Sequence, residues 1–354
     1  MRKSSISGLR SKLSFFIYFI PVSYLSIYYF QMSLDFIFQE DIPLIKNRVK
    51  LGLCCINNEL NSDKKNRIYC NRTLIRRTFT VDKAKDCALK NVKDIIPLVD
   101  WNVKNNIHHL RLSSDMFPHY TDRETESYTM DFCDEELKRA GDHCKSVNHR
   151  ITMHPGQYNQ VGAKSQSVFD HTVNDLSMHA EILDRMGMDN NAVLCVHGGG
   201  LYGDKESAIR RWIEQYDDLP TNVKSRLAIE NCEKCYCVRD CLEIAQATGI
   251  PLIYDTHHYS CYSILHKEEE QEPIEDMMDE IVDTWKKTSR TPVFHISEQA
   301  PDKRIGAHSD YIETLPSHLL DVVVNYDTDI HIEVEAKAKE KAIKKLMTSY
   351  NYLF

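Results

Sequence analysis

Histidine and carboxylate side chains recur in this chain at the ends of short apolar runs. His154 follows the run Ile151–Met153, and Pro155 and Gly156 come directly after it, where they end a strand. The same arrangement returns in the segments LCVHGG, LAIEN, LIYDTHH, VFHIS and HIEVEAK. One histidine at a strand end is usually a satisfied core residue, but this recurrence indicates a site that several strands build together.

The apolar runs alternate with stretches of helical spacing. Strands are predicted near residues 49–57, 107–112, 151–154, 192–196, 226–229, 251–254, 292–294 and 329–334. Helices are predicted over 91–105, 132–147, 167–186, 205–216, 238–247 and 273–287, and from Lys337 onward. No linker or low-complexity tract interrupts the alternation. Because eight βα units typically occupy about 250 residues or more, the pattern predicts an α/β protein with a single closed (β/α)8 TIM barrel.

In such a barrel the residues that open the loops after the strands meet at one face. Imidazole and carboxylate groups at these positions suit Zn, Mn, Fe or Mg, and one tetrahedral ion needs only three or four of them. We therefore expect two or three divalent ions. The predicted ligands are His119, His154, His197, Glu230, Asp255, His258, His295, His308 and Glu335. Among them, His154, His197, Glu230, Asp255, His295 and Glu335 are expected to form the catalytic centre.

Clustered divalent ions serve two chemistries well: hydrolysis of a phosphodiester and isomerisation of a sugar. The loops favour nucleic acid, because Gln157 and Tyr158 place a polar and an aromatic side chain directly after His154, and Arg111 adds a cation. A basic segment after the first strand interleaves cations with tyrosine, asparagine and threonine, as a phosphate-contacting surface does. Its cations are Lys64, Lys65, Arg67, Arg72, Arg76 and Arg77. The alternative interpretation of this segment is a solvated loop.

The composition is that of an ordinary globular protein of 354 residues, 42% hydrophobic and 27% charged, with a net charge of -8. Negative charge does not exclude DNA, since bound cations offset a carboxylate-rich site. Twelve scattered cysteines indicate an intracellular, reducing compartment, cytoplasm or nucleus. A zinc or redox role is the alternative for the group Cys232, Cys235, Cys237 and Cys241.

The chain is expected to divide into an N-terminal extension, residues 1–46, and a barrel domain, residues 47–354. The apolar run 13–30 is broken by Pro21 and barely reaches the roughly 20 residues that a membrane span needs. A dispensable extension is favoured over a membrane anchor. We expect a monomer with no obligate protein partner.

The sequence resembles the UV damage endonucleases. The resemblance extends from about Lys50 to Ile343 and is carried by the motifs LGLCCIN, NRT, LRLSSDMFPH, HPGQY, VHGGGLYGDK, IENCE, IYDTHH, FHISE, AHSDYI and EAKAKEKA. It implies a barrel of the xylose-isomerase-like superfamily and a Mn- or Mg-dependent nick immediately 5′ to UV photoproducts in duplex DNA, with Mn favoured and Zn as an alternative. The same nine metal ligands match, and Asn57, Gln157 and Tyr158 match residues that read the lesion.

The chain departs from the family pattern in strand seven. A lysine that can be carbamylated into a further metal ligand precedes the histidine there, whereas this chain carries Val293, two residues before His295. Alternation places Val293 on the same interior face as His295. The leading hypothesis is a working metal-dependent endonuclease with altered metal demand. A sugar isomerase or epimerase, and a damage-binding protein that no longer cuts, are the alternatives.

Overall fold

The computed structural model describes residues 41–354, and within them eight parallel strands form a closed barrel in chain order, β1 to β8. The predicted fold class is therefore confirmed. The strands are β1 (Val49–Cys54), β2 (His109–Leu112), β3 (Arg150–Met153), β4 (Leu194–His197), β5 (Leu227–Glu230), β6 (Leu252–Asp255), β7 (Val293–Ile296) and β8 (Ile330–Val334). The barrel closes where β1 pairs with β8, with Gly52 opposite Glu333.

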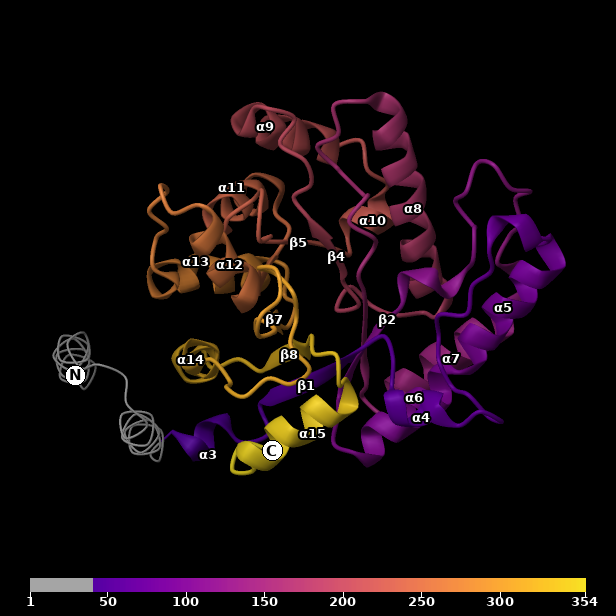
Figure 1. Ribbon diagram of the computed structural model, residues 1–354, viewed down its shortest axis with the longest axis horizontal. Coiled ribbons are helices and arrows are strands. Elements are labelled where there is room, and N and C mark those ends of the chain that lie inside the picture. Colours follow the sequence, from indigo (N-terminus) through magenta and orange to yellow (C-terminus); the bar gives the residue numbers. More distant parts are fainter. Residues whose placement is uncertain (1–40) are drawn as a thin grey trace, which may run out of the picture. The chain divides into compact units, whose positions relative to one another are not determined.

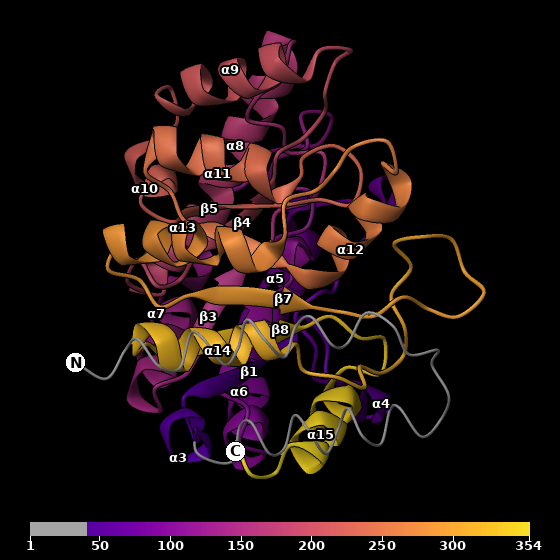
Figure 2. The same cartoon turned by 90° about the vertical axis from the view of Figure 1, so that its left-hand side faces the viewer.

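Helices surround the barrel on its outer side (Figure 1). They include α5 (Val81–Lys93), α6 (Ile95–Lys104), α7 (Asp134–Ser146), α8 (Gln166–Arg185), α9 (Lys205–Tyr216), α11 (Val238–Thr248), α12 (Thr256–Leu265), α13 (Ile274–Lys287), α14 (Ser317–Tyr326) and α15 (Glu340–Ser349). In the side view of Figure 2, α11, α13 and α14 lie next to one another outside the strands. Short helices α3 (Ile42–Ile45), α4 (Asn58–Ser62) and α10 (Thr221–Lys224) complete the α-helices of the described residues.

Two differences from the predicted helices have local causes. The helix predicted over 91–105 corresponds to α6 and the last three residues of α5, which begins at Val81, and the two helices meet at Asp94. Pro97 has no N–H to donate to the carbonyl four residues earlier, so a continuous helix cannot run through this point. The helix α14 was not predicted, because its run of valines has the composition of a strand.

One part of the barrel interior below the loops is apolar, whereas His109, Thr152 and Glu333 form a buried polar network in another part. Five inward side chains, Val193, Cys195, Ala228, Ile253 and Val293, pack with Trp285 and are at most 2% exposed. Since side chains alternate along a strand, the residues two positions further on, such as His197, Glu230, Asp255 and His295, also face inward and end the barrel at its carboxyl-terminal mouth. The sequence expectation for Val293 agrees with this register.

Residues 46–354 form one compact unit. The predicted extension, including the apolar run 13–30, lies almost entirely outside the described residues. In the part of the chain that the structure describes, no helix is long and apolar enough to cross a membrane.

Candidate metal centre

The strand ends bring the predicted ligands to one mouth of the barrel. His197, Glu230 and Asp255 are the last residues of β4, β5 and β6, while His154 and Glu335 directly follow β3 and β8. The strands are held by continuous parallel pairing, for example His197 opposite Glu230. The site is therefore built on rigid elements, which fixes the positions of its side chains.

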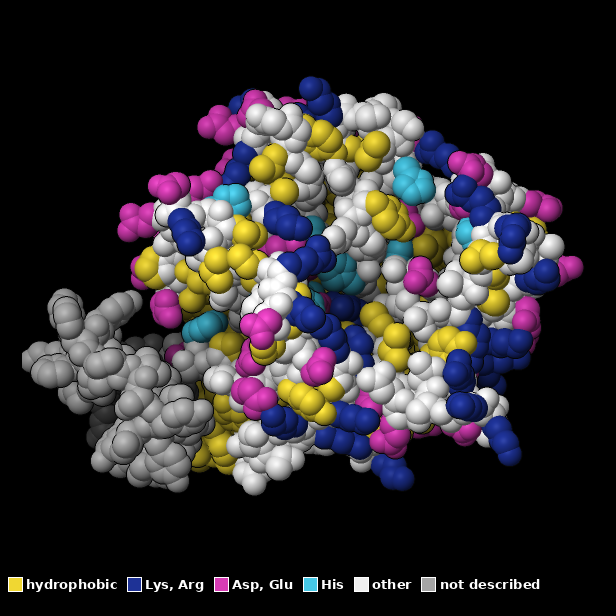
Figure 3. Space-filling view, in the orientation of Figure 1, with side chains coloured by type: hydrophobic (Ala, Val, Ile, Leu, Met, Phe, Trp, Pro, Cys, Tyr) yellow, Lys and Arg dark blue, Asp and Glu magenta, His cyan; other side chains and the backbone are white. Residues whose placement is uncertain are grey.

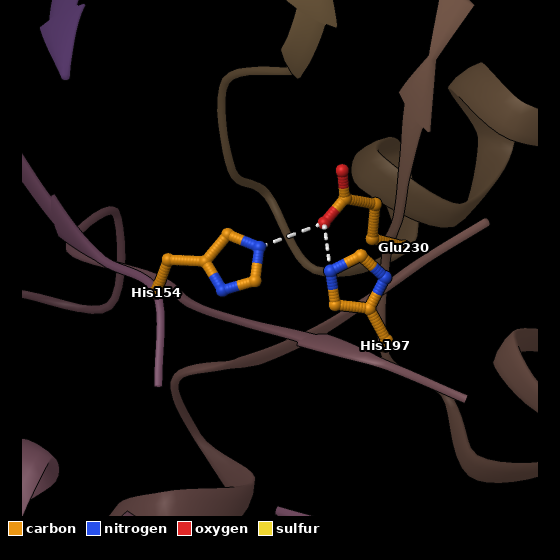
Figure 4. Close-up of side chains that lie close together, drawn as sticks. All are labelled: His154, His197 and Glu230. Atoms are coloured by element: carbon orange, nitrogen blue, oxygen red, sulfur yellow. Dashed lines mark hydrogen bonds and ion pairs between the residues drawn. The ribbon is translucent and has the colours of Figure 1, made fainter. Parts of the chain in front are cut away.

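Glu230 lies at the centre and is fully buried. Its Oε2 atom lies 2.9 Å from Nε2 of His154 and 3.5 Å from Nε2 of His197, and Figure 4 shows the two imidazoles converging on this oxygen. Its Oε1 atom lies 2.9 Å from Nδ1 of His295 and 3.4 Å from Nδ1 of His258. One carboxylate thus joins four imidazoles.

Glu335 forms a second part of the cluster. Its Oε1 atom lies 3.6 Å from Nδ1 of His295, and its Oε2 atom lies 3.6 Å from Nδ1 of His308. Arg111 forms an ion pair with Glu335 and also contacts Oε2 of Glu333 at 3.0 Å. Arg111, which the sequence suggested for phosphate binding, therefore holds two carboxylates in place.

The two carboxylate oxygens of Asp255 differ in their hydrogen bonding. Oδ1 accepts a hydrogen bond of 2.7 Å from the backbone N–H of His258 and thereby caps α12. Oδ2 is buried and has no hydrogen-bond partner among the described residues. Nδ1 of His258 lies 3.8 Å from Oδ2, which is beyond hydrogen-bond distance, so Oδ2 can still accept a further ligand.

Burial and neighbouring charges shift the pKa values of the cluster strongly. Burial alone would raise the pKa of Glu230, but His295 and His197 lower it to well below its usual value. Burial lowers the pKa of His197 to about 4. Burial acts in the same direction on His295 and His258, yet the adjacent carboxylates raise the pKa of both far above the usual value. Without bound cations the site therefore holds protons on His295 and His258 at neutral pH.

The donor set fits divalent metal ions. The groups His154–His197–Glu230 and Glu230–Asp255–His258 each place three donor atoms within 4.8 Å of one another. Imidazole nitrogen and carboxylate oxygen are ligands for Zn, Mn, Fe and Mg, so this donor chemistry does not determine which of them binds. The face in Figure 3 shows histidine side chains within a central hollow, with Lys and Arg side chains along its edge.

The structure does not bring His119 to this cluster, which corrects the predicted ligand set. Its Nε2 lies 2.7 Å from the carbonyl of Leu74 and its Nδ1 lies 3.0 Å from Asp122. A 3-10 turn over Ser114–Met116 follows β2, and His119 itself has a left-handed backbone with φ 57°. This loop geometry directs the His119 ring away from the Glu230 cluster, and the spacing of residues in the sequence does not reveal it.

The residues predicted to read the lesion lie in two different environments. Gln157 and Tyr158 form an exposed turn after His154, and Tyr158 is 55% exposed. Tyr158 also lines a cleft of about 470 Å³ together with Phe117, His119 and Asp175. Asn57, by contrast, is fully buried and caps α4 by accepting a hydrogen bond from the N–H of Leu60, so the prediction of lesion contact is corrected for this residue.

The basic segment is only partly available to a ligand. Arg72 is held by Asp94 at 2.7 Å, and Arg76 is held by Asp122 at 3.0 Å. Within residues 41–354 the remaining predicted cations have no carboxylate within 4.0 Å and are exposed. They are Lys64, Lys65, Arg67 and Arg77.

Two buried groups of the site were missed by sequence reasoning. Glu333 is paired with His295 across β7 and β8, and its Oε2 lies 3.1 Å from Nε2 of that histidine. The thiol of Cys195 lies 3.1 Å from Oε2 of Glu230. Period-two alternation would have identified both, because each stands two residues before a predicted ligand, Glu335 and His197.

The thiols of the cysteine group make local hydrogen bonds. The thiol of Cys232 accepts from the N–H groups of Cys235 and Tyr236 at 3.1 and 3.2 Å, while Cys241 donates to the carbonyl of Glu230. The possible metal-binding groups of the described residues contain none of the four. All twelve cysteines are free thiols.

Fold and site together define a class: (β/α)8-barrel proteins with a histidine–carboxylate centre at the carboxyl-terminal mouth. Residues 49–353 match the family described as UV-endonuclease UvdE. The chain belongs to this family.

The comparisons with individual relatives agree with this family membership. The chain is 31% identical over 315 residues to a candidate UV-damage endonuclease of Acanthamoeba polyphaga mimivirus, covering 86% of this chain and 92% of that protein. It is 34% identical over 315 residues to the UV-damage endonuclease of Schizosaccharomyces pombe, covering 86% of this chain and 51%, about half, of the relative. The crystal structure of SacUVDE superposes with a TM-score of 0.74 at 28% identity, over 86% of this chain and 100% of that one.

Proposed function

We propose that the protein nicks duplex DNA immediately 5′ to UV photoproducts, such as cyclobutane pyrimidine dimers and 6-4 photoproducts, by divalent-metal-dependent hydrolysis. The observation that carries the proposal is the Glu230 cluster, in which one buried carboxylate joins four imidazoles at the barrel mouth. Family membership supports phosphodiester hydrolysis over sugar isomerisation, the alternative chemistry for such a cluster.

Two or three divalent ions, with Mn favoured, would be held by His154, His197, Glu230, Asp255, His258, His295, His308 and Glu335. When bound, such ions activate water and stabilise charge on the departing 3′ oxygen. Glu230 belongs to three of the four possible three-donor groups of the described residues, so it would take part in holding more than one ion.

The surrounding residues position the ligands and the DNA. Arg111 fixes the Glu335 carboxylate, and the cap of α12 fixes Asp255. The exposed turn at Gln157 and Tyr158 would fill the gap left by a damaged dinucleotide flipped out of the stack. We retain the prediction of an intracellular monomer.

The proposal is tested with a labelled duplex that carries one cyclobutane dimer. The purified protein with Mn is expected to nick the damaged duplex, to leave the matched undamaged duplex intact and to lose activity in EDTA. Equal cutting of both duplexes would overturn the lesion specificity, and full activity in EDTA would overturn the metal dependence.

Metal loading is expected to release protons. Because the pKa of His295 and of His258 is raised above 6.5 in the metal-free site, both imidazoles are protonated at neutral pH and must lose a proton to bind an ion. Mn affinity should therefore rise with pH through and above pH 6.5, with about two protons released per protein at pH 7. Titration calorimetry in buffers of different ionisation enthalpy measures this number. A binding heat that does not depend on the buffer would contradict the protonation of His295 and His258 in the metal-free site.

Replacing Val293 by lysine tests the missing ligand. Val293 is fully buried beneath His295, so Val293→Lys is expected to lower stability by about 1–3 kcal/mol and to alter metal stoichiometry or nicking rate in a bicarbonate-dependent way. Val293→Met, of similar length without the amine, is the control. If the two variants match in metal content and rate, with and without bicarbonate, position 293 does not act on the metals.

A further inference from the structure

A second cavity lies at the opposite, amino-terminal end of the barrel. It has a volume of about 560 Å³, within the usual range for small-ligand sites, and its lining includes Lys50 of β1, Arg150 of β3, His331 of β8, His149 and Thr291. We call it the basal cavity. On β3, Arg150 precedes His154 by four residues, about 13 Å along the strand, so the cavity is separate from the candidate metal centre.

Arg150 is a buried cation without a carboxylate in direct contact. The residue is only 8% exposed. Its Nε donates a hydrogen bond to the carbonyl of Asn191, and its Nη1 donates to the carbonyl of Thr291, both at 2.9 Å. Nη2 has no partner. In residues 41–354 no carboxylate lies within 4.0 Å of this guanidinium, and although burial lowers the pKa of Arg150 to about 9, it stays charged at pH 7. A buried unpaired charge is costly unless a ligand compensates it.

The neighbouring groups are a cation, Lys50, and two imidazoles, His331 and His149. Lys50 and His331 are register partners on β1 and β8, and Nδ1 of His331 has no partner. His149 is 3% exposed, and its Nδ1 is also unpartnered.

Of the two acidic residues of the lining, only Asp329 is paired with a cation. Asp329 accepts from Arg48 at 2.8 Å, and Asp189 accepts from the N–H of Asn191 at 2.9 Å. The cavity therefore presents the positive charges of Arg150 and Lys50, together with one carboxylate, Asp189, that has no cation within 4.0 Å among the described residues.

We propose that the basal cavity binds a phosphate group, either free or on a small metabolite. A tetrahedral oxyanion accepts several charge-assisted hydrogen bonds at once, and the planar guanidinium of Arg150 matches its geometry. Lys50 at the rim adds a second positive charge.

The test is calorimetric titration with inorganic phosphate at constant ionic strength set by chloride, on metal-loaded protein and after EDTA treatment. Any phosphate binding through the metal ions is expected to disappear after EDTA treatment, whereas phosphate binding at the basal cavity is expected to persist. AMP serves as a second ligand: tighter binding than phosphate would assign a phosphate monoester, and equal or weaker binding would assign the free ion.

The variants locate the site. Arg150→Met is expected to weaken phosphate binding by at least about tenfold, and Lys50→Gln by several-fold. Arg290→Met is the matched control, because Arg290 is 6% exposed and has no carboxylate partner in the described chain, yet does not line the cavity. The proposal is overturned if EDTA-treated wild-type protein shows no saturable binding, or if Arg290→Met weakens binding as much as Arg150→Met. If Arg150→Met does not fold, unchanged binding by Lys50→Gln overturns it.

Discussion

Replacing Glu230 by glutamine is expected to reduce nicking of a damaged duplex by about a thousandfold, a loss of about 4 kcal/mol of transition-state stabilisation. The change preserves shape but removes the charge that joins His154, His197, His258 and His295. It also turns an amide N–H₂ toward imidazole nitrogens in a fully buried site. Metal content, measured by elemental analysis, should fall in parallel.

Glu340 provides a matched control. It is also fully buried, but its oxygens accept from the backbone N–H groups of Asn58 and Glu59 outside the cluster. Glu340→Gln should lower thermal stability while retaining metal and rate per folded molecule. A Glu230→Gln variant that keeps its metals and its rate would contradict the central role of this carboxylate.

Replacing Gln157 and Tyr158 together by alanine is expected to weaken binding to damaged duplex by about thirtyfold, about 2 kcal/mol, with little effect on undamaged duplex. The reason is that the exposed Tyr158 ring can stack on bases and fill the space of a flipped dinucleotide. Metal content should stay unchanged, because neither side chain contacts the Glu230 cluster. Affinities are compared by fluorescence anisotropy on the two duplexes.

Tyr326→Ala is the control for the loss of a tyrosine. Both tyrosine hydroxyls donate to an aspartate, Tyr158 to Asp175 and Tyr326 to Asp279, but Tyr326 ends α14 away from the mouth. Equal weakening on damaged and undamaged DNA by the double variant would assign Tyr158 to loop packing instead.

The barrel was predictable because its signal is repeated. β4 to β7 are short, largely apolar strands, and the parallel topology brings the histidine or carboxylate at or next to the end of each to the same face. The predictions for His154, His197, Glu230, Asp255 and His295 as neighbours therefore required only the strand order, which the closed barrel confirms.

Residues in loops were less predictable. His119 lies beyond a 3-10 turn, and its backbone conformation decides where the ring points. Asn57 stands at the start of α4, and an asparagine at such a position can cap the helix as readily as it can contact a ligand. The partners of Arg72 and Arg76 come from distant segments, which charge spacing in the sequence does not reveal.

The most direct test of the endonuclease assignment maps the cut at single-nucleotide resolution. A duplex with one cyclobutane dimer, labelled on the damaged strand, is incubated with protein and Mn, and the products are resolved beside a sequencing ladder, with Glu230→Gln as the control. The endonuclease assignment predicts one cut at the phosphodiester immediately 5′ to the dimer, with 3′-hydroxyl and 5′-phosphate ends, and no cut by the variant. A cut elsewhere, or equal cutting by Glu230→Gln, would contradict it.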